Sequence, residues 1–184
     1  STLNSIASEL KTADYDLVVP IVTPATQAVV NAGVSAPVVF ISVTDPVAAG
    51  IMGDMAKPDK NATGTSNIVP VDEIFTLAGK LTPDVKNIGI LYCSGEKNAV
   101  LTAEKAKAYL DTTDYTYEEV TVASSNEVQQ AAQSLAGKVD AIYIPIDSTV
   151  QSAMAQVVEA ANAAGIPVYG SDPVMVKSGA LACV

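Results

Sequence analysis

The sequence contains no histidine, no arginine and no tryptophan among its 184 residues. Without histidine, the Ser-His and Cys-His pairs that activate nucleophiles and the histidine-containing metal sites are excluded. Without arginine, no planar guanidinium group can hold a phosphate or carboxylate through two parallel hydrogen bonds. An anionic ligand must therefore be bound by backbone N–H groups, hydroxyls, amides or lysine.

Cysteine and positive charge are also scarce. The two cysteines, Cys93 and Cys183, are far apart and fit no metal spacing, so we expect buried thiols, and a disulfide between them stays open. Ten lysines stand against twenty acidic residues, which gives a net charge of −10. Such a surface repels phosphate backbones and anionic lipids, so we expect no nucleic-acid binding and no binding to membrane surfaces.

Targeting and cofactor motifs are missing from the sequence as well. It shows no signal peptide and no transmembrane run, but it begins inside a predicted helix, so we expect targeting residues to be missing from it. No glycine-rich dinucleotide fingerprint or P-loop follows any predicted strand. We therefore predict neither a cofactor nor a metal.

Hydrophobic residues make up 49% of the chain, enough for a sizeable core. Short apolar runs alternate with helical patterns, which predicts an α/β fold with parallel sheets covered on both faces. The predicted strands are Leu17–Val22, Val38–Val43, Asn87–Tyr92, Thr116–Thr121, Ala141–Ile146, Val168–Gly170 and Ala180–Val184. The predicted helices are residues 2–10, 24–33, 71–81, 97–110, 125–136 and 149–164. Their predicted N-caps are Ser1, Ser125 and Ser148, and two of them end at Gly33 and Gly165.

Residues 1–47 and 124–174 resemble each other. Each has a polar-capped helix, an aspartate, a strand containing proline, a hydroxyl-rich turn ("VTPAT" or "IDSTV") and a glutamine. Each continues with an Ala/Val-rich helix that ends in "NAG" or "NAAG", and then a strand closed by Asp-Pro. The matching order of caps, turns and helix ends predicts an internal repeat of an α-β-α-β unit, which is too long to be the period of a solenoid.

The repeat predicts two Rossmann-like lobes, with lobe 1 and the crossover in residues 1–66 and lobe 2 in residues 67–184. Ligands of parallel sheets bind beyond the carboxyl ends of strands, so we expect a cleft between the lobes that closes on a small ligand. Lobe 1 has only two predicted strands and lacks a counterpart of residues 86–123. Because two parallel strands make a poor independent core, we expect the sequence to be a truncated or central fragment of a longer protein.

The order of several short motifs resembles the ABC importer solute-binding proteins of the tryptophan/tyrosine-type group. These motifs are "TPATQAV", "PVVFISVTDPVAAGIM", "NATGTSN", "GILYCSGEKNA", "IPIDSTV" and "GALA". The resemblance implies the type I periplasmic-binding-protein fold, no enzymatic activity and a small ligand, often an amino acid, with aromatic amino acids among those expected. It also implies ABC permease subunits as partners and export from the cytoplasm, commonly as a lipoprotein. Contact with the membrane would then be only through a lipid anchor outside this chain.

An amino acid ligand would need a carboxylate for its ammonium group and donors for its own carboxylate. Asp147, after a strand, is the first choice for the ammonium group; Ser148 and Thr149, with free N–H groups at a helix start, could hold an anionic group. Simple N-capping by Asp147 or Ser148 stays open as the alternative. The other predicted ligand residues are Thr23, Thr44, Asp45, Thr65, Ser66, Ser94, Glu96, Asn98 and Asp172. For Asp45 and Asp172, which precede proline, a turn-forming role is equally expected.

Three other functions fit parts of the sequence. "SGEK" at residues 94–97 matches the Ser-x-x-Lys pattern of penicillin-recognising enzymes, but their other motifs are missing. The ligand-sensing effector domain of a transcription regulator would have the same lobes. A sensor domain of a membrane receptor is the third. The set of motifs favours the importer protein over these alternatives.

Overall fold

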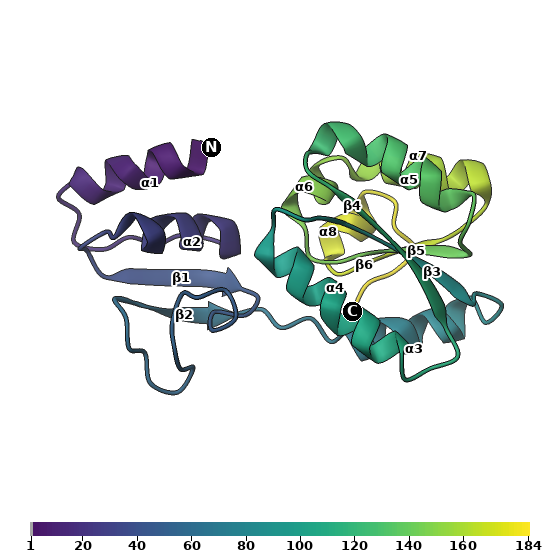
Figure 1. The fold of residues 1–184 in the computed structure, drawn as a ribbon, viewed down its shortest axis with the longest axis horizontal. Coiled ribbons are helices and arrows are strands. Elements are labelled where there is room, and N and C mark those ends of the chain that lie inside the picture. Colours follow the sequence, from purple (N-terminus) through teal and green to yellow (C-terminus); the bar gives the residue numbers. More distant parts are fainter. Residues whose placement is uncertain (1) are drawn as a thin grey trace. The chain divides into compact units, whose positions relative to one another are not determined.

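The computed structural model describes residues 2–184, and they form two compact units, Ser1–Ile68 and Val69–Val184. The division predicted from the sequence, between residues 66 and 67, lies two residues earlier. Each unit has its own hydrophobic core and is described by itself below (Figure 1).

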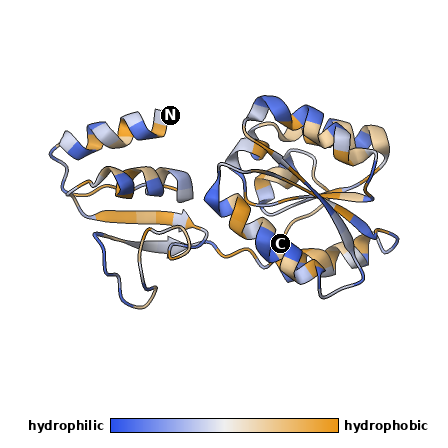
Figure 2. Cartoon of the chain, in the orientation of Figure 1, coloured by the Kyte–Doolittle hydropathy of each residue, from blue (hydrophilic) through white to orange (hydrophobic). Residues whose placement is uncertain are grey.

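Unit 1 is a small parallel sheet packed against helices. Its helices are α1 (Thr2–Thr12) and α2 (Thr23–Ala32), and its paired strands are β1 (Val38–Val43) and β2 (Ala62–Ser66). β1 is hydrophobic along its length (Figure 2), and its alternate residues Val38 and Phe40 are buried in the core of this unit. Strand β2, "ATGTS", has no apolar pattern, and the sequence analysis did not predict it.

The predicted strand Leu17–Val22 is only partly formed. Val18 and Ile21 make single parallel bridges to β1, and no continuous ladder joins them. Pro20 has no N–H group to donate, and Val22 turns out of extended geometry at φ 65° to start α2. Leu17 and Ile21 remain about half exposed, at 48% and 58%.

Unit 2 is a four-stranded parallel sheet with helices on both faces (Figure 1). The strands are β3 (Asn87–Cys93), β4 (Thr116–Val122), β5 (Ala141–Ile144) and β6 (Val168–Gly170), in the order β4-β3-β5-β6. The helices are α3 (Val71–Leu81), α4 (Lys97–Leu110), α5 (Val128–Ala136), α6 (Ser148–Ser152), α7 (Met154–Ala164) and α8 (Pro173–Lys177), with a 3-10 turn at Ser125–Glu127.

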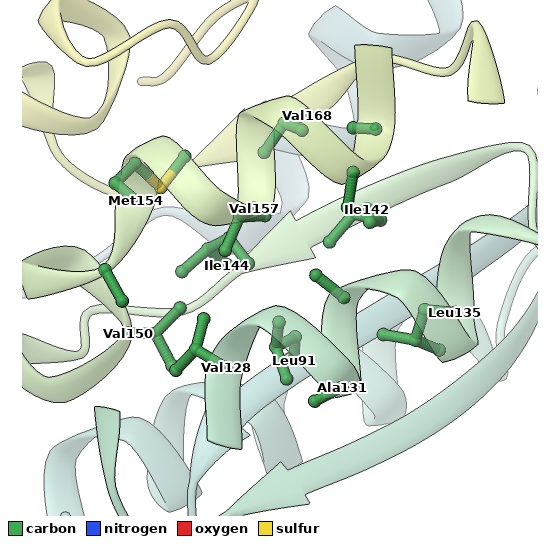
Figure 3. Packing of buried hydrophobic residues seen from close by; sticks show 14 of the residues in the cluster. Leu91, Val128, Ala131, Leu135, Ile142, Ile144, Val150, Met154, Val157 and Val168 are labelled. Carbon is green, nitrogen blue, oxygen red and sulfur yellow. The ribbon is translucent and has the colours of Figure 1, made fainter. Parts of the chain in front are cut away.

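Both faces of this sheet bury apolar side chains, as expected for parallel strands. On one face, Val128 and Leu135 of α5 and Val157 of α7 pack on Ile142 and Ile144 of β5 (Figure 3). The other face packs against α3 and α4. The α/β class and the parallel sheets are as the sequence predicts.

Several helices and strands of the structure differ from those predicted from the sequence. The predicted helix 149–164 is two helices, because α6 ends at Ser152 and the chain leaves helical geometry at Ala153 before α7. The predicted helix 125–136 begins as the 3-10 turn. The C-terminal strand is a single bridge between Tyr169 and Ala182, and α8 was not predicted. Gly33 and Gly165 do end helices, at φ 71° and 70°, where a side chain would be strained.

The predicted caps differ too. Ser1 lies outside the described residues. At α6 the N-cap is Asp147, whose side chain accepts a hydrogen bond from Val150 N–H, and Ser148 is the first helical residue. Before α5, Ser124 and not Ser125 is hydrogen-bonded to Glu127. Both cysteines are free thiols, with Cys93 buried and Cys183 half-buried.

Candidate functional site

The site of unit 2 lies where the order of strands reverses. After β3 the chain forms β4, which pairs with one edge of β3, and then β5, which pairs with the other edge of β3. In parallel sheets this reversal opens a crevice beyond the carboxyl ends of the two central strands, which is where ligands bind. The turns after β3 and β5 are therefore adjacent, although more than fifty residues separate Glu96 from Ser148 and Thr149.

The side chain of Glu96, in the turn after β3, reaches the turn after β5. Glu96 is the last residue before α4, but its side chain makes no hydrogen bond to α4 N–H groups. Its Oε1 accepts hydrogen bonds from the N–H and the hydroxyl of Thr149, at 2.8 and 2.6 Å, and its Oε2 accepts one from Ser148 N–H at 3.0 Å. The side chain is only 8% exposed. Its buried charge is thus stabilised by neutral donors at the start of α6.

The side chain of Asp147, in the turn after β5, reaches back to the end of β3. Its Oδ2 accepts a hydrogen bond from Cys93 N–H at the end of β3, at 2.5 Å, and its Oδ1 caps α6 through Val150 N–H at 2.8 Å. Burial raises the pKa of Asp147 to about 6, and the charge of Glu96 adds to that rise, whereas the hydrogen bonds from Cys93 and Val150 oppose it. Asp147 therefore carries a charge that its neutral donors do not fully stabilise.

Asn98 is the third buried polar residue of the site. Its Nδ2 donates to Ile146 C=O at 2.8 Å, and a longer contact of 3.4 Å reaches Glu96. Its Oδ1 is buried and has no hydrogen-bond partner among the described residues. The two turns thus bring together Glu96, Asn98, Asp147, Ser148 and Thr149, all of which the sequence predicted as ligand residues. The cluster has more acceptors than donors.

One detail of the sequence prediction is wrong. The N–H groups of Ser148 and Thr149 were expected to be free for an anionic group, but both donate to Glu96. The sequence could not show this, because it depends on which strands are neighbours in the sheet.

The predicted ligand residues of unit 1 gather at the carboxyl end of its sheet. Thr23 begins α2, and its buried hydroxyl accepts a hydrogen bond from Thr44 N–H at 3.3 Å. Thr65 lies in β2 and accepts one from Ser42 N–H at 3.2 Å. Ser66, the last residue of β2, is exposed and pairs in register with Val43.

The remaining predicted residues mainly have local partners. Asp45 accepts a hydrogen bond from Ala48 N–H, and Asp172 caps α8 through Val174 N–H, so both show the turn-forming contacts expected before proline. Ser94 is exposed, and its N–H and hydroxyl both donate to Val122 C=O. Their roles in ligand binding remain predictions.

Two residues at the end of the unit 1 sheet escaped the sequence analysis. Val22 and Ser42 have positive φ angles, 65° and 57°, which are uncommon for residues other than glycine and strained for a β-branched side chain. Val22 precedes α2, and Ser42 interrupts the register of β1 and β2. Neither residue type signals such geometry in a sequence.

Metal sites and membrane spans are absent from the described part of the chain. Residues 2–184 contain no group of three or more Cys, Asp or Glu side chains placed to hold a metal ion. Within the same range, no helix combines the length and the apolar character needed to cross a membrane.

Comparison with known proteins identifies the family of the chain. Residues 1–184 match the family model described as ABC transporter substrate binding protein. The tyrosine-binding protein of Clostridioides difficile is 38% identical over 182 residues, which are 99% of this chain and 53% of that protein. The chain therefore spans about half the length of that relative.

Two solved structures are similar over most of this chain. The ABC domain from Streptococcus pneumoniae in complex with L-Trp has a TM-score of 0.93 and 37% identity, over 97% of this chain and 62% of that one. A conserved domain protein from Vibrio cholerae has a TM-score of 0.94 and 39% identity, over 97% and 60%. The family binds substrates and is not enzymatic, as the sequence analysis expected. This chain belongs to the ABC transporter substrate binding protein family.

Proposed function

We propose that the protein binds an amino acid and that Asp147 receives its ammonium group. The observation that carries this proposal is the surplus of acceptors beyond β3 and β5. Two buried carboxylates and the partnerless Asn98 Oδ1 meet there, and the donors around the carboxylates are neutral. An ammonium group brings three donors and a positive charge, which is what such a cluster lacks.

The ligand class that we propose is an aromatic amino acid, tyrosine or tryptophan. The support comes from two relatives, one described as tyrosine-binding and one solved in complex with L-Trp. The ligand carboxylate would be held by hydroxyl and backbone donors, since the chain has no arginine.

The role that we propose is delivery of this amino acid to the permease subunits of an ABC importer. The protein would act outside the cytoplasm, as a periplasmic or extracellular protein, and a lipid anchor outside these 184 residues would hold it at the membrane. The family match over the whole chain supports this role over an effector domain of a transcription regulator or receptor.

The test is isothermal titration calorimetry with L-tryptophan and L-tyrosine, comparing the wild type with Asp147→Asn. Asparagine keeps the size of the side chain but loses the charge. A charge-assisted hydrogen bond contributes about 1.5–3 kcal/mol, so we expect affinity to fall roughly tenfold to a hundredfold. Circular dichroism checks that the variant folds. Equal affinity in a folded variant would remove Asp147 from the site.

A further inference from the structure

The two buried carboxylates of unit 2 are not equivalent. Glu96 is saturated, because its two oxygens accept three hydrogen bonds from Ser148 and Thr149 in addition to the longer contact with Asn98. Asp147 accepts one hydrogen bond on each oxygen, and the N–H of Thr149, which donates to Glu96, also acts on Asp147 and lowers its pKa. The carboxylate of Asp147, a residue that is 2% exposed, is therefore held by fewer hydrogen bonds than that of Glu96.

The position of Glu96 is not explained by capping its own helix. It directly precedes α4, where an acidic side chain commonly binds the first N–H groups, yet it binds none of them. It instead takes up the donors of a turn more than fifty residues further along the chain. Those N–H groups are the ones that could otherwise bind a ligand carboxylate.

We propose that Glu96 is a positioning and specificity residue: it fills the donors at the start of α6, so that this half of the site accepts an ammonium group and rejects a carboxylate. This inference rests on the proposed function and deepens it, since it assigns how the ligand is oriented. The negative charge of Glu96 attracts the ammonium group that Asp147 binds. The same charge repels an acid that lacks an ammonium group.

The test compares two ligands that differ by the ammonium group, L-tryptophan and indole-3-propionate, by isothermal titration calorimetry. In Glu96→Gln the carbonyl oxygen can still accept from Thr149, but an NH2 group replaces the oxygen that accepts from Ser148, and the charge is gone. We expect the preference for L-tryptophan over indole-3-propionate to fall about tenfold, the ratio that corresponds to about 1.4 kcal/mol. Glu96→Ala, which also frees the α6 donors, should reduce the preference at least as much.

Glu127→Gln is the matched control. Glu127 also accepts from a backbone N–H and a hydroxyl near a helix start, on Ala123 and Ser124, but it lies in the turn after β4 and is hydrogen-bonded to neither Glu96 nor Asp147. The control should keep the wild-type preference. An unchanged preference in folded Glu96→Gln would overturn the proposal, as would an equal loss in the control.

A second measurement needs no ligand and separates the two hypotheses. The pKa of Asp147 is followed by NMR of its side-chain carboxyl carbon in the wild type and in Glu96→Gln. We expect a lower pKa in the variant, because the charge of Glu96 adds to the rise that burial causes. If the chain binds neither ligand, the proposed function fails for it, and an unchanged pKa of Asp147 would overturn the role of Glu96 independently.

Discussion

Asp147 shows how one buried side chain can both cap a helix and join two turns of the sheet. Its carboxylate caps α6 through Val150 N–H and also ties the α6 turn to the end of β3 through Cys93 N–H. The alternative that the sequence left open, simple N-capping, is thus correct as far as it goes. It leaves the charge of a buried carboxylate incompletely stabilised, and this has a measurable effect on folding.

The stability of the protein should depend on pH through Asp147. Its pKa is raised from 3.8 to about 6, chiefly by burial, so the folded state prefers the protonated form. The stabilising contribution of this group is therefore complete below about pH 4 and is lost as pH rises through 6. We expect the free energy of unfolding of the wild type, relative to Asp147→Asn, to fall between pH 4 and 7. Urea unfolding at several pH values measures this.

A flat or rising difference across that range would show that Asp147 has an ordinary or lowered pKa in the folded protein. Glu127→Gln serves again as a control: Glu127 is not among the groups that shift the pKa of Asp147, so this substitution should leave the pH dependence due to Asp147 unchanged. Both variants remove one negative charge, so a general effect of net charge would appear in both.

At the residue scale, the sequence predicted residues that the structure brings together beyond β3 and β5, but not how they are hydrogen-bonded. Asp147 and Glu96 each follow an apolar strand, and that position is readable from the sequence. Each of the two side chains accepts hydrogen bonds from the turn that carries the other, and this depends on β3 and β5 being neighbours in the sheet. The strained backbone at Val22 and Ser42 was beyond prediction, because neither residue type favours positive φ.

At the element scale, prediction succeeded where hydrophobic pattern and punctuation agreed. β1, β6, α3 and α4 have the predicted bounds, since apolar residues at strand or helix spacing mark each of them. β2 was missed because its residues are small and polar, with Ala62 buried and the rest exposed. It forms a strand through pairing with β1 and through a close approach at Gly64.

That close approach predicts an effect of Gly64→Ala. A Cβ at residue 64 would lie 2.0 Å from the backbone oxygen of Phe40 and 2.6 Å from its ring, and backbone cannot move aside without separating β1 from β2. We expect a loss of about 2–3 kcal/mol in the free energy of unfolding, at the upper end of overpacking effects. Urea unfolding followed by circular dichroism measures it.

Gly137→Ala is the matched substitution, because a Cβ there meets no atom within 4 Å and the backbone is αR with φ −84°. It should change stability by no more than about 0.5 kcal/mol. If Gly64→Ala cost no more than this control, the tight pairing of β2 with Phe40 would be contradicted.

At the scale of the whole molecule, the two units differ in the size of their sheets and therefore in their expected stability. Unit 2 has four paired strands with helices on both faces, and its central strand β3 is buried along almost its whole length. Unit 1 has two paired strands, and Leu17, Val19, Ile21 and Ile41 stay at least 40% exposed beside them. Sheets of two strands are marginal by themselves, so unit 1 should open more easily than unit 2.

Hydrogen exchange resolved by mass spectrometry or NMR measures this difference directly. The N–H groups of Val39 and Ile41 in β1 donate to the carbonyl oxygens of Val18 and Pro20. We expect these two amides to exchange at least about tenfold faster than those of Ile90 and Leu91 in β3. The physical reason is that opening β1 disrupts the smaller hydrophobic cluster of unit 1, whereas opening β3 disrupts both clusters of unit 2. Equal protection of the two strands would contradict the prediction and mean that both units unfold in one cooperative step.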